Sequence, residues 1–332
     1  MRILVTGATG FLGNNVVRAL LNDNHEVAVT LRHSSDRKAL DGLNVELITV
    51  DLNNPNDVAE ALAGCDAVVH AAAMIQLGWT KLEESRKVNV EATAIIAEAA
   101  RRKNIRMIYV SSVDALGVAS KDQPGTEQQL DPPKPACSYV ISKREAETAV
   151  ILEVANGLDA VIVNPGFLVG PYDWKPSSGE MMLTVAKSLI YFVPAGGCSV
   201  VDVRDVADGI LSAIKHGQTG ERYILGGENL TYFEFWTLIA KVTHTGGPKK
   251  PLPNWLAKTA GRFGDIWTKL SGRECNINSA ATQMGQMFNY YSSDKAKKQL
   301  GYQIGSVEDA LRDAWDWFVL HGYAKNKRGP DK

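Results

Sequence analysis

The chain has 332 residues, enough to bury a substantial core in one large domain or in two closely joined ones. Hydrophobic residues make up 45% and charged residues 22%, as is ordinary for a soluble globular protein. Lys and Arg number 36 against 37 Asp and Glu, a net charge of −1, which argues against a nucleic-acid partner and against an acidic tail.

The cysteines, the histidines and the start of the chain exclude further classes. The four cysteines are widely spaced and the six histidines have no metal-ligand spacing, so we expect reduced thiols and no metal. The apolar run after Met1 is too short for a signal peptide, and no stretch approaches the length of a transmembrane helix. We therefore expect a cytoplasmic protein without a membrane partner.

Short apolar runs alternate with helical patterns through the first half of the chain. Runs that are apolar throughout suit strands buried on both faces, and helices between them imply the right-handed crossovers of a parallel sheet. The predicted strands are residues 3–6, 26–31, 45–50, 67–70, 106–111 and 160–163, and the predicted helices are residues 11–21, 82–103 and 137–155. The pattern predicts an α/β fold with a Rossmann-type doubly wound parallel sheet.

The regularity ends after Asn164. Residues 171–199 are rich in Pro, Gly and Ser, two further strands are predicted at 200–203 and 222–225, and the C-terminal part is mostly helical. We predict an NAD(P)-binding domain made of residues 1–165 and 198–227. A smaller, mostly helical substrate-binding domain is then formed by residues 166–197 and 228–332.

A glycine-rich turn joins the first predicted strand to the first predicted helix. A dinucleotide pyrophosphate needs close approach to backbone N–H groups at a helix N-terminus, and glycines at GxxGxxG spacing permit the turn, the approach and the helix–strand packing. The alternative is a glycine-rich turn without a ligand. We predict that this turn binds the cofactor through Gly7, Thr9, Gly10, Phe11, Leu12 and Gly13.

The end of the second predicted strand bears on the choice of cofactor. Sites that prefer NAD tend to hold an acid here for the ribose 2′-OH, whereas an arginine accommodates the 2′-phosphate of NADP. This chain has Arg32 at that position, followed by Arg37 and Lys38. We predict NADP as the cofactor, with NAD less favoured; the alternative for Arg32 is a plain surface residue.

Further motifs follow the other predicted strands: Asp51-Leu52, His70-Ala71-Ala72-Ala73 and Ser111-Ser112, with Tyr139 and Lys143 on the next helix. Together with the glycine-rich turn they resemble the extended short-chain dehydrogenase/reductase family over nearly the whole chain. The Asn164-Pro165-Gly166 segment is similar to its dihydroflavonol-4-reductase and 3β-hydroxysteroid dehydrogenase branch.

The resemblance implies positions for the rest of the cofactor. Asp51 and Leu52 are expected to flank the adenine. The pyrophosphate and ribose are expected to be lined by Ala71, Ala72 and Ala73. The nicotinamide end is expected to be held by Pro165, Gly166, Phe167 and Leu168, with Tyr139 and Lys143 also in contact with the cofactor.

A catalytic group is predicted from Tyr139 and Lys143. A lysine four residues after a tyrosine lies on the same helix face, and its charge is expected to lower the tyrosine pKa from its usual value near 10. Tyr139 can then act as general acid/base, while Ser112 hydrogen-bonds the same substrate oxygen. Side chains alternate along a strand, so only one of Ser111 and Ser112 can face the site. The resemblance to the family, aligned to Gly117, implies that it is Ser112. Asn89 is taken as structural.

The substrate region is less well defined. Residues 74–79 stand where related reductases contact substrate, and we assign Met74, Gln76, Asp114, Phe167 and Trp174 to substrate binding. An apolar cluster either lines the pocket or forms the core of the small domain: Met181, Met182, Leu183, Leu189, Ile190, Tyr191 and Phe192. Few bases lie in this segment, although Arg204, Arg222 and Arg262 could converge on it.

These features favour a carbonyl reductase or alcohol dehydrogenase acting with NADP(H) on a hydrophobic or aromatic small molecule. One alternative is a nucleotide-sugar epimerase or dehydratase with tightly bound NAD, which needs cationic groups for a diphosphate. Another is an NADP-sensing binding protein, against which the intact Ser112, Tyr139 and Lys143 argue. The sequence leaves open whether the protein forms a homodimer.

Overall fold

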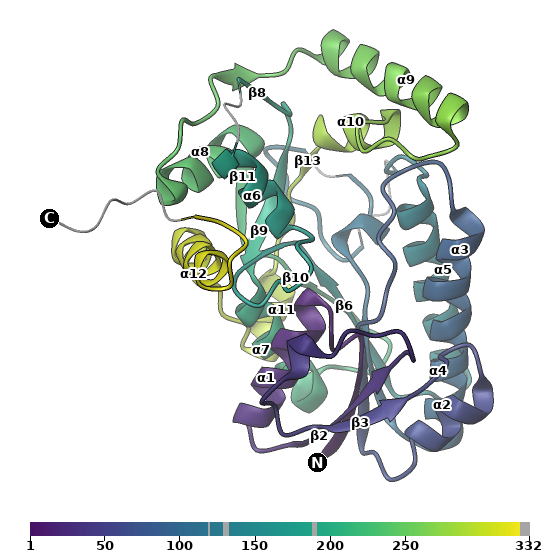
Figure 1. Cartoon of the computed structure of the whole chain (residues 1–332). Coiled ribbons are helices and arrows are strands. Elements are labelled where there is room, and N and C mark those ends of the chain that lie inside the picture. The colour runs from purple at the N-terminus through teal and green to yellow at the C-terminus, as the bar shows by residue number, and fades with distance from the viewer. Residues whose placement is uncertain (119, 129–132, 188–190, 326–332) are drawn as a thin grey trace, which may run out of the picture.

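Seven parallel strands form the central sheet of the computed structural model, which describes residues 1–118, 120–128, 133–187 and 191–325 (Figure 1). The strand order is β10-β6-β5-β4-β1-β2-β3. The strands are β1 (Arg2–Thr6), β2 (Glu26–Leu31), β3 (Glu46–Thr49), β4 (Ala67–His70), β5 (Arg106–Val110), β6 (Ala160–Pro165) and β10 (Arg222–Leu225). The predicted doubly wound parallel sheet is confirmed.

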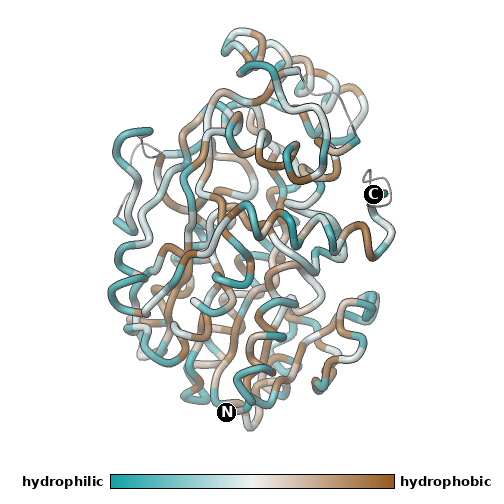
Figure 2. Tube along the Cα trace, turned by 90° about the vertical axis from the view of Figure 1, so that its left-hand side faces the viewer, coloured by the Kyte–Doolittle hydropathy of each residue, from teal (hydrophilic) through white to brown (hydrophobic). Residues whose placement is uncertain are grey.

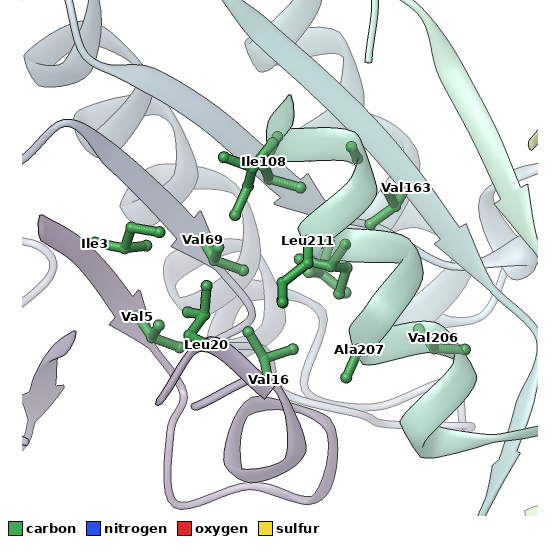
Figure 3. Packing of buried hydrophobic residues seen from close by; sticks show 14 of the residues in the cluster. Ile3, Val5, Val16, Leu20, Val69, Ile108, Val163, Val206, Ala207 and Leu211 are labelled. Atoms are coloured by element: carbon green, nitrogen blue, oxygen red, sulfur yellow. The ribbon is translucent and has the colours of Figure 1, made fainter. Parts of the chain in front are cut away.

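Helices cover both faces of this sheet. On one face α1 (Phe11–Asn22), α7 (Val203–His216) and α11 (Asp294–Leu300) pack against alternate strand residues such as Ile3, Val5 and Val69. Figure 3 shows the part of this layer that α1 and α7 form. On the other face lie α2 (Pro55–Ala61), α4 (Ala92–Arg102) and α5 (Ser138–Ala155). Burial on both faces explains why the central strands are apolar throughout.

The strand order of the central sheet reverses between the neighbouring strands β1 and β4. From β1 the chain proceeds through β2 to β3, whereas β4, β5, β6 and β10 extend the sheet the other way. Ligands of open α/β sheets bind beyond the carboxyl ends of the strands at such a point. The glycine-rich turn after β1 and the alanines after β4 therefore meet at this position.

A second, four-stranded sheet lies beyond those carboxyl ends. It contains β7 (Phe167–Val169), β9 (Gly197–Asp202), β11 (Glu228–Thr231) and β13 (Phe288–Asn289). Its core is completed by α6 (Gly179–Lys187), α8 (Tyr232–Thr243) and α12 (Val307–Leu320). The strand predicted at 200–203 is thus β9 of this sheet, after which α7 and β10 return the chain to the central sheet.

The remaining elements lie at the margins. A long helix runs through α3 (Leu82–Arg86), a π-helical turn (Lys87–Glu91) and α4. Helices α9 (Asn254–Ser271) and α10 (Ser279–Gly285) form a hairpin at the top of Figure 1, and the short strands β8 (Phe192–Val193) and β12 (Lys250–Pro251) pair nearby. Among the described residues, no helix combines the length and apolar character needed to cross a bilayer.

Candidate active site

The glycine-rich turn brings β1, α1 and the end of β4 into close contact. Gly7 has φ +74°, and a Cβ there would lie 2.6 Å from the backbone nitrogen of Ala72. A Cβ on Gly13 would overlap the carbonyl of Gly7, whose oxygen also accepts from the Gly10 N–H at 2.9 Å. Only glycine tolerates such a left-handed turn with this close backbone approach.

The N-terminus of α1 fits a phosphate group. Its N-cap is Gly10, no side chain caps the helix, and no acid stands in its first turn. The first N–H groups of a helix have no partner within the helix, and an anion satisfies them. Gly7, Gly10 and Gly13 are therefore arranged as a dinucleotide-binding turn requires, with Thr9, Phe11 and Leu12 carried on the same turn.

A buried histidine fixes the wall opposite this turn. Thr93 donates to the carbonyl of Asn89 at 2.6 Å, so it accepts from Nε2–H of His70 at 2.9 Å. The hydroxyl of Thr6 then donates to Nδ1 at 2.7 Å and accepts from the Ala72 N–H at 3.2 Å. Burial, aided by the charge of Lys143, lowers the pKa of His70 to about 3, so the ring stays neutral.

Ser112 and Tyr139 meet where β5 ends and α5 begins. Tyr139 lies in the first turn of α5 and is 8% exposed. Its hydroxyl hydrogen-bonds the side chain of Ser112, which also accepts from the Asp114 N–H at 3.1 Å. The Ser111 hydroxyl is buried and has no partner among the described residues. The geometry places Ser112, and not Ser111, beside the tyrosine.

The direction of the Tyr139 pKa differs from the expectation. Burial raises the pKa of Tyr139 above its ordinary value, and the negative charge of Asp114 raises it further, while the hydrogen bond with Ser112 opposes this. The prediction that this pKa is lowered was wrong, because burial dominates the shift and Lys143 is not among the groups that act on it. The phenol is protonated at neutral pH.

Lys143 itself is buried beneath the tyrosine. It is 2% exposed, its Nζ donates to the Val110 carbonyl at 2.8 Å, and it lies 5.2 Å from the centre of the Tyr109 ring. Burial lowers the pKa of Lys143 to about 8, and the carboxylate of Glu147 opposes that shift. At neutral pH the amine is therefore still mostly protonated.

Glu147, which the sequence analysis missed, is the buried anion of this site. One of its carboxylate oxygens accepts from the Asn164 side chain at 2.7 Å and the other accepts from Arg222 Nε at 2.8 Å. The same Asn164 amide donates to the Ser112 carbonyl at 3.0 Å. Its spacing of four residues after Lys143 was the available signal, since both then lie on one helix face.

Lys134 is a second residue that the sequence analysis missed. Its side chain is fully buried and donates to Asp114 at 2.6 Å and to the Val113 carbonyl at 3.0 Å. Burial disfavours its charge, but Asp114 and Tyr291 together raise the pKa of Lys134. Lys134 lies between Pro133 and Pro135 shortly before α5, and its contact with Asp114 spans 20 positions of the chain, which no local spacing signals.

The segment after β4 is tied to the start of α5. The backbone of Met74 makes two hydrogen bonds to the Asn89 side chain, at 2.7 and 2.9 Å, and Asn89 also donates to Ser142 Oγ at 2.9 Å. The carbonyl of Gln76 accepts from the Tyr139 N–H at 3.2 Å. Met74 and Gln76 thus border Tyr139, and Asn89 positions Met74 from the π-helical turn.

The chain crosses from the central sheet to the second sheet at Gly166. Pro165 ends β6, and a Cβ on Gly166 would lie 2.5 Å from the carbonyl oxygen of Ser199. Phe167 and Leu168 begin β7, where both are half-buried, and the Phe167 ring packs edge-on against Phe235 at 5.5 Å. These four residues lie between the sheets, at the carboxyl end of β6.

The far end of the site contains Arg32 and Trp174. Arg32 is exposed directly after β2, and its N–H donates to Ser35 Oγ at 3.0 Å. Trp174 packs edge-on against Trp317, with Lys38 Nζ 5.3 Å from its ring centre. These contacts set Trp174 beside the basic segment after β2, and they give no support to a role for it beside Tyr139.

Asp51 and Leu52 occupy the turn after β3. Asp51 is exposed and accepts from the Asn53 N–H at 3.0 Å, and Leu52 packs against the core beneath α2 and α4. Both residues lie at the carboxyl edge of the sheet, where the adenine is expected.

Packing shows which residues of the apolar cluster form the core of the small domain. Met182 and Leu183 are buried in the core of the small domain, whereas Tyr191 and Phe192 are exposed. Leu189 and Ile190 lie outside the described residues, and Met181 is half-buried against the same core. Of the five described members, three thus pack in or against this core and two do not.

The three arginines do not converge. Arg204 pairs with Asp202 at 2.6 Å and with Asp313 at 2.7 Å. Arg222 is held by Glu147, and Arg262 stands exposed on α9. Hence two of the three cations already have carboxylate partners.

Comparisons with known proteins identify the family of the chain. Residues 3–226 match the model of the NAD dependent epimerase/dehydratase family. A Synechocystis sp. protein provisionally named dihydroflavonol 4-reductase is 34% identical, over 97% of this chain and 96% of its own. The sterol demethylase protein B of Methylococcus capsulatus is 32% identical, over 97% and 99%. The crystal structure of gox2253 superposes with a TM-score of 0.84 at 35% identity, covering 97% of this chain and 99% of that one.

Replacing Glu147 by Gln tests the electrostatics of the site. Removal of the anion that opposes the shift lowers the pKa of Lys143 further below about 8, so the cation is lost at a lower pH. If the charged lysine contacts the cofactor, the pH above which nicotinamide-cofactor affinity falls moves down. Fluorescence titrations across pH measure this, with Glu145→Gln, on the same helix, as the control. An unmoved pH dependence contradicts the assignment to Lys143.

Proposed function

The chain belongs to the NAD dependent epimerase/dehydratase family as an NAD(P)-dependent oxidoreductase of the extended short-chain dehydrogenase/reductase type, and we propose that it is an NADP(H)-dependent carbonyl reductase acting on an apolar or aromatic small molecule. The observation that carries the proposal is a protonated Tyr139 beside Ser112 at the carboxyl end of β5.

The chemistry follows from the protonation state of the tyrosine. NADPH, when bound, supplies a hydride to the carbonyl carbon. Tyr139 donates its proton to the carbonyl oxygen, and Ser112 donates a hydrogen bond to the same oxygen. A phenol whose pKa is raised by burial is a proton donor at neutral pH, which favours reduction of a carbonyl over oxidation of an alcohol. Lys143 keeps a positive charge beneath the reacting groups.

The choice of NADP rests on the segment after β2. Arg32 is exposed, and its guanidinium makes no ion pair with any described residue. The nearby Asp36 accepts from the Lys38 N–H at 3.0 Å. The unpaired guanidinium of Arg32, with Lys38 in the same segment, suits the 2′-phosphate of NADP. Charge-assisted bidentate contacts to phosphate are among the stronger hydrogen bonds.

The apolar substrate class rests on the surroundings of Tyr139. The side chain packs in a small buried cluster with Cys137, Val140, Ala280 and Met284. The names of the two similar curated relatives refer to a dihydroflavonol and a sterol. A nucleotide diphosphate needs several fixed cations, whereas Arg204 and Arg222 are already paired with carboxylates.

The substrate class is tested by NADPH oxidation over a panel of steroid, flavonoid and simple aromatic carbonyls. We expect saturable turnover of a bulky apolar ketone or aldehyde, and no epimerisation of a sugar nucleotide. Sugar-nucleotide epimerases and dehydratases also occur among the relatives. Micromolar binding of a sugar nucleotide without turnover of any apolar carbonyl would therefore favour the epimerase alternative.

Tyr139→Phe tests the proton donor. The variant loses only a hydroxyl, so we expect kcat to fall by about 100-fold or more while cofactor affinity changes little. Steady-state turnover and cofactor titration measure the two quantities separately. Tyr290→Phe, which removes a hydroxyl from a residue outside the catalytic group, is the matched control. Turnover of Tyr139→Phe within a few-fold of the parent excludes the assigned role.

Arg32→Glu tests the choice of cofactor. The parent is expected to bind NADPH more tightly than NADH, and the variant to lose about 10- to 100-fold in NADPH affinity, as loss of a hydrogen bond to a charged group implies. NADH affinity is expected to stay the same or to rise. Lys103→Glu, an equal charge change at the end of α4, is the control. Equal affinities of the parent for the two cofactors would contradict the role of Arg32.

A further inference from the structure

The large apolar side chains of α9 face solvent and its small residues face the protein, the reverse of an ordinary amphipathic helix. Its buried positions are small: Ala257, Gly261, Gly264 and Thr268. Its large apolar residues are exposed, and we call Trp255, Phe263, Ile266, Trp267 and Leu270 the outer face of α9. Leu270 is 81% exposed and Trp255 is 69% exposed. Figure 2 shows apolar stretches along this helix at the top of the molecule.

The buried side of α9 has no room for larger side chains, so the helix cannot rotate about its axis to bury its large residues. A Cβ on Gly264 would overlap the carbonyl of Ile277, and one on Gly261 would overlap the side chain of Thr282. The backbone of α9 therefore lies directly against α10 and the loop before it. Small residues hold the helix in this orientation, so the exposure of the outer face is fixed by packing. Contiguous exposed apolar surface of this kind marks an interaction site.

Positive charge lies along one edge of the outer face. Lys258, Arg262 and Lys269 are exposed, and their spacing of four and seven residues puts them on one stripe. None of the three makes an ion pair with another described residue. The one acid between them, Asp265, accepts from the Ser279 N–H at 3.0 Å. The edge thus has three free cations.

The segment after β4 is joined to α10 and to the loop before it, on which the inner side of α9 packs. Trp79 Nε1 donates to Ser279 Oγ at 2.8 Å, and Asn278 donates to the Leu77 carbonyl at 2.8 Å. Like Leu77, Trp79 has an exposed side chain, and between them in this segment lies the Gly78 carbonyl that accepts from the Ser138 N–H at 2.9 Å. Ser138 is the residue before the catalytic tyrosine.

We propose that the outer face of α9 docks on an anionic lipid membrane surface, with the helix lying in the interface. Trp, Phe and Leu on one face beside a row of cations match the amphipathic helices that insert to the headgroup boundary. Anionic headgroups complement the free cations of the edge. A twofold contact between copies through this face would instead bring like charges together. The proposal departs from the expectation of no membrane partner because only the structure turns these residues outward.

Vesicle flotation of the full chain tests the docking without any readout of activity. We expect binding to vesicles of phosphatidylcholine with phosphatidylglycerol, weak binding to phosphatidylcholine alone, and a blue shift of tryptophan fluorescence on binding. Replacing Lys258, Arg262 and Lys269 by Gln is expected to lower the partition coefficient about fivefold per charge, and so roughly a hundredfold in all. Phe263→Ser with Trp267→Ser is expected to abolish binding.

Matched controls separate this face from the rest of the surface. Lys87, Lys103 and Lys298 are exposed elsewhere, and their joint replacement by Gln makes the same charge change; Leu320→Ser removes an exposed apolar side chain from α12. Both controls are expected to bind vesicles like the parent. Absence of binding by the parent at low ionic strength, or equal binding by all variants, overturns the proposal. So does a parent dimer that Phe263→Ser with Trp267→Ser converts to a monomer without any vesicle binding, which identifies the face as an interface between copies.

Discussion

A buried ammonium group is the constraint on which the candidate active site depends. Lys143 is almost inaccessible to water, and an uncompensated buried charge costs several kcal/mol. The protein keeps the charge by giving Lys143 a carbonyl acceptor on β5, an aromatic face at Tyr109 and a carboxylate, Glu147, one turn away. These partners leave the pKa of the lysine close enough to neutral for its charge to respond to small changes around it.

The partners of Glu147 extend this constraint across the sheet. Its two oxygens are bound by Asn164 at the end of β6 and by Arg222 at the start of β10, and Asn164 also fixes the carbonyl of Ser112. Helix α5 is thereby held in register with β5, β6 and β10. The hydroxyl of Ser112 and the phenol of Tyr139 meet because the elements that carry them share one buried polar network, in which each lost partner leaves another group unsatisfied.

Close backbone approach allowed by glycine has different consequences in two parts of the molecule. At Gly7 and Gly13 it draws β1, α1 and the end of β4 together, and it leaves the N–H groups of α1 open to a phosphate. At Gly261 and Gly264 it seats α9 on α10. Because small residues fill that inner contact, the large apolar residues of α9 are left outside, where water is an unfavourable neighbour and a lipid interface is a favourable one.

The sequence by itself determined the elements whose signals are local. Apolar runs and helical periodicity predicted the strands and helices of the central sheet, and the spacing of glycines after β1 identified the turn, because each depends on residues within a few positions of one another. The four-residue spacing of Tyr139 and Lys143 likewise put both on one helix face. The roles of Arg32 and of the substrate residues remain predictions.

Only the tertiary structure decided what depends on distant neighbours. The strands of the second sheet pair with segments far away in the chain, so their short sequences carry little signal of their own. The pKa of Tyr139 is raised because packing removes water from it, which no spacing reveals. Lys134 forms an ion pair with Asp114, and Met182 is buried in the core of the small domain. The outer face of α9 is exposed because glycines fill its other side, and the same helical pattern alone would have fitted a buried apolar stripe equally well.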